Sequence, residues 1–381
     1  MAPLCLAAQG AVGFYARSVP ASYVVAAGAE LSLPAPLTAV AGSGERTTVS
    51  LWGMIPVKEV SVKEAGDMQV ILGGGLFGMK MYTDGVLVVG LTDVDGPGGN
   101  CRPAAEAGIR VGDLIRKVDG VPVTATAELA RLLERSEGRP VTVTLHRDGV
   151  TFPVSFAPVL SMVEGKCKAG LWVKDSAAGI GTVSFYLPRG RVLAGLGHPV
   201  CDGDTGGILP LLTGEAMDAR VFGVTGSVKG SAGEICGGFE GDPLGTLRVN
   251  GDTGVYGVMD QIPPGELITV APKQEIRTGP AQVVCTLDNG PPCRYEILIT
   301  RVRRGGGEQD MEITVTDPDL LARTGGIVQG MSGSPILQNG KLVGAVTHVL
   351  VNDPQKGYAI FAETMMTTAQ SVAAGEGQAA A

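Results

Sequence analysis

Short apolar runs separated by glycine- and proline-rich turns dominate most of the chain. Residues 47–51 and 56–62 alternate as strands do, and residues 159–381 hold many similar segments. No long amphipathic helix is predicted before the last residues. The clearest strand segments after residue 159 are Leu171–Val173, Gly179–Tyr186, Val192–Leu196, Val283–Leu287, Tyr295–Arg301 and Met311–Val315. This pattern predicts an all-β domain of the kind that forms a pair of barrels.

A mixed pattern fills residues 69–158. Gly73–Met81 is a glycine-rich loop that runs into a strand, and Val86–Leu91 is a second apolar strand. Pro103–Gly108 predicts a short helix that ends at glycine. Thr126–Glu137 has helical periodicity with its leucines on one face. An α+β domain is therefore expected ahead of the all-β domain, and the fold class is mainly β.

The remaining segments are shorter. Residues 31–68 are expected to form a small β-rich preamble. Residues 2–16 are uncharged and mildly apolar, but too short to span a bilayer comfortably and without a basic stretch before them. We interpret residues 1–30 as the remnant of an export signal or membrane anchor, with an ordinary terminus as the alternative.

Composition narrows the function classes. The 381 residues include 58 Gly and 24 Pro, and 44% are hydrophobic, which excludes a disordered chain and suggests two or three domains. A net charge of −8 without a basic face disfavours nucleic acid as a partner. Three histidines and no CxxC spacing predict no metal site and no cofactor. Cys285 and Cys293 flank a turn-rich stretch, where a disulfide and two free thiols are both compatible with the sequence.

The main chemical motif is the run from Gly330 to Pro335, Gly-Met-Ser-Gly-Ser-Pro. Glycines permit the unusual backbone that exposes a serine on a tight turn. We predict Ser332 as the nucleophile, with the backbone N–H groups of Gly330 and Ser332 as the oxyanion hole. Ser334 is the less favoured alternative. The motif resembles Gly-Asp-Ser-Gly-Gly-Pro of chymotrypsin-like peptidases.

The residues after this motif extend the resemblance. A strand, an Asn-Gly turn and a second strand follow, as between a nucleophile and the strand that pairs with substrate. Val346, Thr347 and His348 are accordingly expected at the substrate cleft. His348 is expected as a wall of the specificity pocket or as a packed strand residue.

A general base is also needed, and histidine suits this task because its pKa lies near neutrality. His146 belongs to the α+β domain and reads as a surface residue, whereas His198 stands at a strand end between Gly197 and Pro199. We predict His198 as the base. The sequence offers several acids to orient its imidazole, and spacing alone does not decide among Asp202, Asp204, Asp260 and Asp317.

The α+β domain resembles a PDZ domain of the type attached to bacterial proteases. The run from Ala104 to Gly120, with Ala-Gly-Ile-x-x-Gly-Asp-Leu-Ile-x-x-Val-Asp-Gly at its end, carries this resemblance. It implies that a peptide ligand adds a strand to a sheet edge. Phe77, Gly78 and Met79 are expected to form the loop that holds the peptide carboxylate. The alternative is a groove that is closed or serves only internal docking.

Residues 69–370 as a whole resemble the SpoIVB peptidase family, the stage IV sporulation protein B of endospore-forming bacteria. In that family the PDZ domain precedes the peptidase domain, whereas HtrA-type proteases have the reverse order. The matching stretches are Gly85–Gly90, Asp175–Thr182, Gly195–His198, Thr324–Ile336, Gly344–Val349 and Val351–Pro354. The resemblance implies a chymotrypsin-like double β-barrel with Ser332, His198 and Asp317 as its triad. Residues 201–260 lack matching strings.

The family resemblance also implies a biological role. Its members are exported into the space between the two forespore membranes and cleave themselves. They then cleave a membrane-bound regulator of an intramembrane protease, which triggers processing of pro-sigma K. Two alternative hypotheses for the function remain: a catalytically inactive PDZ scaffold, and an HtrA-type envelope quality-control protease.

Overall fold

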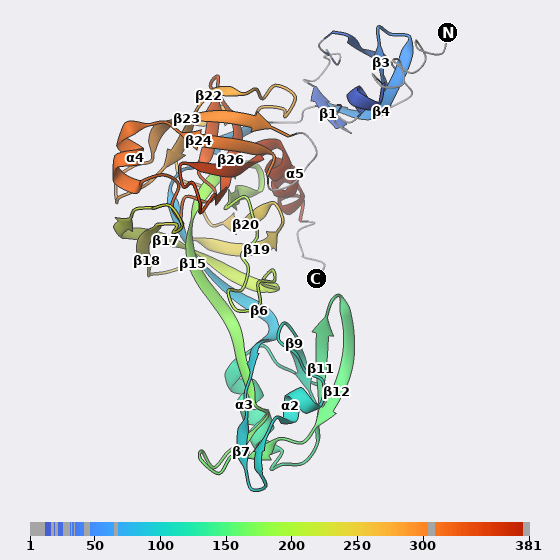
Figure 1. Cartoon of the computed structure of the whole chain (residues 1–381), viewed down its shortest axis with the longest axis vertical. Coiled ribbons are helices and arrows are strands. Elements are labelled where there is room, and N and C mark those ends of the chain that lie inside the picture. The colour runs from blue at the N-terminus through green and yellow to red at the C-terminus, as the bar shows by residue number, and fades with distance from the viewer. Residues whose placement is uncertain are drawn as a thin grey trace.

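The computed structural model describes residues 12–16, 19, 22–25, 31, 33, 35–41, 46–64, 68–303 and 309–375. Figure 1 shows a small N-terminal sheet, a pair of packed barrels and an elongated module joined to the barrels by two long strands. The interpretation of residues 1–30 as an export or anchor remnant falls mostly outside the described residues. Among the described helices, none has the length and apolar character needed to cross a membrane.

The N-terminal unit is a four-stranded sheet with its own small core. Its strand order is β1-β4-β3-β2, and Val49 and Val60 are almost completely buried in it. The strands are β1 (Ser22–Val25), β2 (Leu37–Ala41), β3 (Arg46–Leu51) and β4 (Ile55–Glu64). This sheet corresponds to the β-rich preamble expected over residues 31–68, except that β1 begins earlier.

The first barrel is a closed ring of strands. The order β6-β17-β19-β20-β16-β15 returns to β6 through an additional β6–β15 pairing, and β5 and β21 continue the sheet from β15. The six barrel strands are β6 (Leu76–Leu91), β15 (Leu171–Leu187), β16 (Val192–Gly195), β17 (Leu211–Thr225), β19 (Gly245–Gly251) and β20 (Gly254–Met259). The strands attached to them are β5 (Gln69–Leu72), β18 (Glu234–Phe239), which pairs with β17, and β21 (Leu267–Thr269). A short 3₁₀ turn, η1 (Arg189–Arg191), joins β15 to β16.

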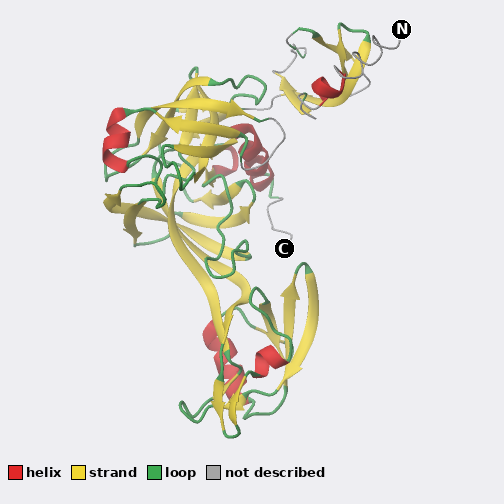
Figure 2. Cartoon of the chain, viewed as in Figure 1, coloured by secondary structure: helices red, strands yellow, loops and turns green. Residues whose placement is uncertain are grey.

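The second barrel is closed by six strands in the order β22-β23-β24-β27-β26-β25. These are β22 (Gly279–Cys285), β23 (Cys293–Val302), β24 (Met311–Val315), β25 (Pro335–Gln338), β26 (Lys341–Val349) and β27 (Lys356–Phe361). Helix α4 (Pro318–Thr324) lies between β24 and β25, and α5 (Ala362–Ala373) follows β27. Two six-stranded antiparallel barrels confirm the predicted mainly β, chymotrypsin-like fold class, as the predominance of strands in Figure 2 illustrates.

The PDZ-like module, residues 85–175, is inserted between β6 and β15. Its core joins Val86 and Val88 of β6 to Leu129 and Leu133 of a helix, and Val173 of β15 packs against this core. Its elements are β7 (Val94–Gly96), β8 (Gly99–Cys101), α2 (Pro103–Glu106), β9 (Leu114–Val118), β10 (Val121–Pro122), α3 (Thr126–Arg135), β11 (Val141–Arg147), β12 (Val150–Phe156), β13 (Val159–Leu160) and β14 (Cys167–Lys168).

The module limits differ from the expected 69–158. Residues 69–84 pair with barrel strands, because Leu72 lies opposite Phe185 of β15 and Thr83 lies opposite Leu211 of β17. At the other end the module core reaches Ala169. Both limits fall within or beside strands that the barrel and the module share, so no change of composition marks them.

The predicted carboxylate-binding loop at Phe77, Gly78 and Met79 is wrong. These residues lie in the middle of β6, paired with β15 on one side and β17 on the other. Phe77 and Met79 are also 4% exposed, in the core of the first barrel. With both backbone edges taken, no peptide strand can be added there.

Helix α5 seals the junction between the barrels. It packs against β16 and β20 of the first barrel and β26 and β27 of the second. Met365 and Ala369 of this helix are completely buried in the cluster that joins the two barrels. Helix α5, at the end of the chain where the sequence first allows a longer amphipathic helix after residue 159, thus binds the two halves of the peptidase fold together.

We expect Met365→Ala to destabilise the barrels by about 2–5 kcal/mol, because it opens a cavity where the two barrels meet. Denaturant unfolding followed by far-UV circular dichroism measures the change in the free energy of unfolding. The matched control is Gln370→Ala on the exposed face of the same helix, which should change stability by less than about 0.5 kcal/mol. Equal effects of the two substitutions would contradict the sealing role of α5.

Candidate active site

The loop that carries Ser332 lies between α4 and β25 and has the backbone that its glycines permit. Gly330 and Gly333 have φ of +97° and +94°. A Cβ on Gly333 would lie 2.0 Å from the Thr182 carbonyl oxygen and 2.5 Å from the Leu196 nitrogen. The second glycine of the motif is therefore required by its contact with the first barrel.

The predicted oxyanion donors have no protein partner. Among the described residues, neither the Gly330 N–H nor the Ser332 N–H donates to an acceptor. The flanking amides are engaged, since the Met331 N–H donates to Val328 O and the Gly333 N–H to Val346 O. Two unpaired amides beside a candidate nucleophile are what an oxyanion hole requires.

Strand β15 holds this loop through three hydrogen bonds that the sequence did not predict. The Thr182 N–H donates to Ser332 O at 3.0 Å, and the Thr182 hydroxyl donates to Gly330 O at 2.7 Å. The Ser184 hydroxyl donates to Gly333 O at 2.7 Å. Both side chains are almost completely buried. In the sequence, these contacts are indicated only by two hydroxyl side chains, Thr182 and Ser184, at alternate positions of an otherwise apolar strand.

The two serines of the motif have different environments. Ser332 is half-buried, and its hydroxyl donates to Thr347 O at 2.8 Å. The Ser334 hydroxyl is fully buried and has no hydrogen-bond partner among the residues that the structure describes. Since a nucleophile must reach substrate, this geometry favours Ser332 over the alternative Ser334.

His198 lies just after β16, facing the second barrel across the junction. The preceding Gly197 packs on Thr347, with an added Cβ only 3.1 Å from the Thr347 methyl group. The His198 Nδ1 contacts Pro199 O at 2.8 Å, which fixes Nδ1 as the protonated nitrogen and leaves the Nε2 lone pair for base chemistry. The segments of His198 and Ser332 meet at Thr347, but in the described residues no hydrogen bond joins the two side chains.

Burial lowers the pKa of the His198 imidazole below its ordinary value of 6.5. The hydrogen bond to Pro199 O acts in the opposite direction, and electrostatic repulsion by His348 adds to the lowering. The two imidazole centroids are 4.7 Å apart. His198 is therefore neutral at pH 7 and able to accept a proton.

The three residues predicted at the substrate cleft differ in role. Val346 is completely buried, and its N–H and carbonyl are bonded to Ser334 O and the Gly333 N–H. Thr347 is buried as well and accepts from Ser332 through its carbonyl. His348 alone is exposed, beside His198. Only the His348 side chain can thus line an open cleft.

Asp317 serves as the N-cap of α4. Its Oδ1 accepts from the backbone N–H groups of Asp319 and Leu320, both at 3.0 Å, and its Oδ2 accepts from the Glu296 N–H at 3.1 Å. Burial acts to raise the pKa of the carboxyl, but these hydrogen bonds outweigh it, so the pKa lies below the ordinary value. No hydrogen bond to His198 is formed, and the assignment of Asp317 as triad acid stays a prediction.

The other candidate acids are not bonded to His198 either. Asp202 and Asp204 both pair with Lys174 of β15, at 3.2 Å for Asp202. Asp202 also accepts from the N–H groups of Asp204 and Thr205, which shapes the loop after His198. The hydrogen bonds of Asp260 involve its backbone: its carbonyl accepts from Arg191 and its N–H donates to Leu244 O. In the described residues, the only hydrogen-bond partner of the His198 ring is Pro199 O.

Cys285 and Cys293 are free thiols that lie directly opposite each other on β22 and β23. Cys285 is buried, which raises the pKa of its thiol to about 12, while Cys293 is exposed. Of the two arrangements compatible with the sequence, the structure has the free thiols. The described residues contain no group of three or more metal-binding side chains.

Two models of known protein families match parts of this chain. The model of the SpoIVB peptidase S55 family matches residues 165–366, and a PDZ domain model matches residues 102–147. A search of the curated proteins found no match.

Solved structures give more distant matches. The active form of the Rv3671c protease from M. tuberculosis is 15% identical with a TM-score of 0.30, over 51% of this chain and 74% of that chain. The HtrA-type protease AlgW with a decapeptide is 15% identical with a TM-score of 0.32, over 54% of this chain and 55% of that chain. Because the peptidase family model covers more than half of the chain, this protein belongs to the SpoIVB peptidase S55 family and is a serine peptidase with a PDZ domain.

Proposed function

We propose that this serine peptidase is a sporulation signalling endopeptidase that uses Ser332 and His198 to cleave itself and a membrane-bound regulatory protein. The observation that carries the catalytic part is the meeting of the Ser332 loop and the His198 segment at Thr347, beside two unpaired backbone amides. Family membership supports the signalling part.

The proposed reaction begins when the Ser332 hydroxyl exchanges its hydrogen bond to Thr347 O for one to His198. The imidazole takes the hydroxyl proton while Oγ attacks the scissile carbonyl carbon. The amides of Gly330 and Ser332 stabilise the resulting oxyanion. The imidazolium then gives its proton to the leaving amine, and water releases the acyl group by the same steps in reverse order.

An acceptor for the His198 Nδ1–H is needed to keep Nε2 available as the base. In the structure the Pro199 carbonyl meets this need. A neutral acceptor stabilises the imidazolium less than a carboxylate does, so a Ser332–His198 pair with a backbone acceptor would be a slower catalyst than a full triad. This suits a peptidase that acts on few substrates.

The biological setting follows from the family resemblance. It supports export into the space between the forespore membranes, with anchoring through the N-terminal segment. It also supports a regulator of an intramembrane protease as the target, with pro-sigma K processing downstream. A PDZ peptide ligand and the chain itself complete the proposed partners, and no cofactor is required.

Two alternatives are distinguished by activity. A catalytically inactive PDZ scaffold is favoured by the missing His198–Ser332 hydrogen bond, although such bonds often form only with substrate. An HtrA-type quality-control protease would degrade unfolded proteins such as casein broadly, whereas a signalling peptidase would leave them largely intact.

The pH profile tests His198 as the base. Since the pKa of His198 is lowered, kcat/KM should decline on the acid side with a midpoint below pH 6.5. His348→Asn removes the repulsion and should move this decline to higher pH. A decline centred above 6.5 in the wild type would contradict a buried neutral base.

Asp317→Asn tests the triad acid. Asparagine keeps the N-cap through its Oδ1, but its NH2 group cannot accept from the Glu296 N–H, so stability should fall by about 1–2 kcal/mol while the protein stays folded. From the hydrogen bonds in the structure we expect kcat to fall by less than about tenfold, whereas loss of a triad acid costs about 10⁴-fold. A loss of that size in a variant that is still fully folded would show that the carboxylate reaches His198 once substrate binds.

Self-cleavage tests the whole proposal. Purified wild type should trim its own N-terminal region, and Ser332→Ala and His198→Ala should reduce the rate by about 10⁴-fold or more. Ser334→Ala, with the same change two residues away, should cleave normally. Adding wild type to labelled Ser332→Ala protein measures cleavage in trans. Intact chains in every mixture, even with a membrane regulator, would favour the inactive scaffold.

A further inference from the structure

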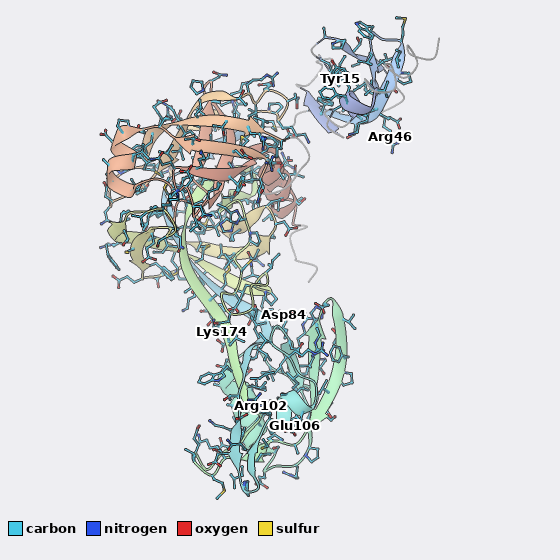
Figure 3. All side chains as sticks on the ribbon, in the orientation of Figure 1. Tyr15, Arg46, Asp84, Arg102, Glu106 and Lys174 are labelled. Atoms are coloured by element: carbon cyan, nitrogen blue, oxygen red, sulfur yellow. The ribbon has the colours of Figure 1, made fainter. Side chains whose placement is uncertain are left out.

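Strand β15 belongs to both the PDZ domain and the first barrel. Figure 1 shows it running beside β6 from the lower module into the barrels, and Figure 3 labels Lys174 at the waist between them. Its first residues, Leu171–Lys174, pair antiparallel with Leu87–Leu91 of β6. The opposite edge of this part of β6 is held by β9. The edge of β6 within the PDZ domain is therefore already filled by the chain itself.

A helix covers this internal strand. Helix α3 packs against β14 and the start of β15, and the Asp175 Oδ2 accepts from the N–H of Thr126 at 2.8 Å and its hydroxyl at 3.0 Å. An extended segment between a sheet edge and a helix occupies the place of an added peptide strand. Residues 171–175 thus lie where a peptide ligand would bind, and such a ligand would have to displace them.

The internal strand is packed loosely enough to be displaced. None of Leu171–Ile180 is fully buried, whereas Gly181–Phe185 are all buried. Trp172 is 65% exposed. A cavity of about 480 Å³ remains between α3 and this segment, lined by Leu129, Leu133 and Val173 among others. Weak burial gives a segment a low free energy of local opening.

The same strand touches both halves of the active site. Lys174 pairs with Asp202 and Asp204 in the loop that follows His198. Eight and ten residues further on, Thr182 and Ser184 donate to the carbonyls of Gly330 and Gly333. A change at the PDZ end of β15 therefore acts on elements that carry the base and the oxyanion donors.

We infer that residues 171–175 are an internal ligand of the PDZ domain, and that an extended peptide which displaces them lowers peptidase activity by releasing the Lys174 contacts and loosening the β15 hold on the Ser332 loop. The inference rests on the proposed catalytic roles of Ser332 and His198. Oxyanion donors stabilise a transition state only when they are held in position beforehand. Thr182 and Ser184 are accordingly positioning residues.

The first experiment compares full-length wild type, Asp175→Asn and the control Asp148→Asn, which removes a carboxylate from the exposed β11–β12 turn. Amide hydrogen exchange over residues 171–175 should become about tenfold faster in Asp175→Asn alone, because a charge-assisted hydrogen bond is weakened. Amide exchange over residues 329–333 should also become faster in Asp175→Asn. The rate at which a fluorophosphonate labels Ser332 should fall. Faster exchange at 171–175 with an unchanged Ser332 loop would overturn the coupling.

The second experiment adds a fluorescent synthetic peptide with the sequence of residues 169–176. It should bind Asp175→Asn at least about tenfold more tightly than wild type and slow fluorophosphonate labelling as it binds. Equal affinity for both proteins would overturn the internal-ligand role. If wild-type Ser332 is not labelled at all, the proposed function fails, while hydrogen exchange and peptide affinity still decide the displacement.

Thr182 provides a separate test within the barrel. Thr182→Val keeps the shape but removes the hydroxyl donor to Gly330 O, and should lower kcat about tenfold at constant KM. Thr182→Ser restores the donor and should restore kcat. A merely structural role would lower stability without this rescue of kcat, and that result would contradict positioning by Thr182.

Discussion

The continuous pairing of β6 with β15 is the constraint on which the rest of the structure depends. It closes the first barrel and forms one edge of the PDZ domain, and it sets the place of Thr182 against the Ser332 loop. Antiparallel pairing fixes register, since a slip of one residue would turn every side chain to the opposite face. The position of the nucleophile loop thus follows from an alignment of strands that begins in another domain.

The chemistry of the Ser332 loop was readable from the sequence because it depends on local backbone. Gly333 can have no side chain against Thr182 O, and that requirement appears directly as a glycine after the serine. His198 was also identified from the sequence, because few histidines were available. The acceptor for its ring is Pro199 O. Because every residue has a main-chain carbonyl, the amino-acid sequence does not reveal this contact.

The errors concern elements that depend on distant pairing. Phe77 to Met79 look like a glycine-rich loop, but strands β15 and β17, about 100 and 140 residues away in sequence, make them a central strand. Helix α4 was a different omission. Asp317 followed by proline, with Gly325 in the left-handed conformation at its end, is a sequence pattern for a short capped helix.

The order of strands in the second barrel has a consequence for synthesis of the chain. Closure requires β25 to pair with β22 and β27 to pair with β24, and α5 to cover the junction. The chain segments that complete the barrel therefore leave the ribosome after the nucleophile itself. A partly synthesised chain that already contains Ser332 lacks the strand that supplies Thr347 O and the walls around the loop, so it carries no assembled site inside the cell that makes it.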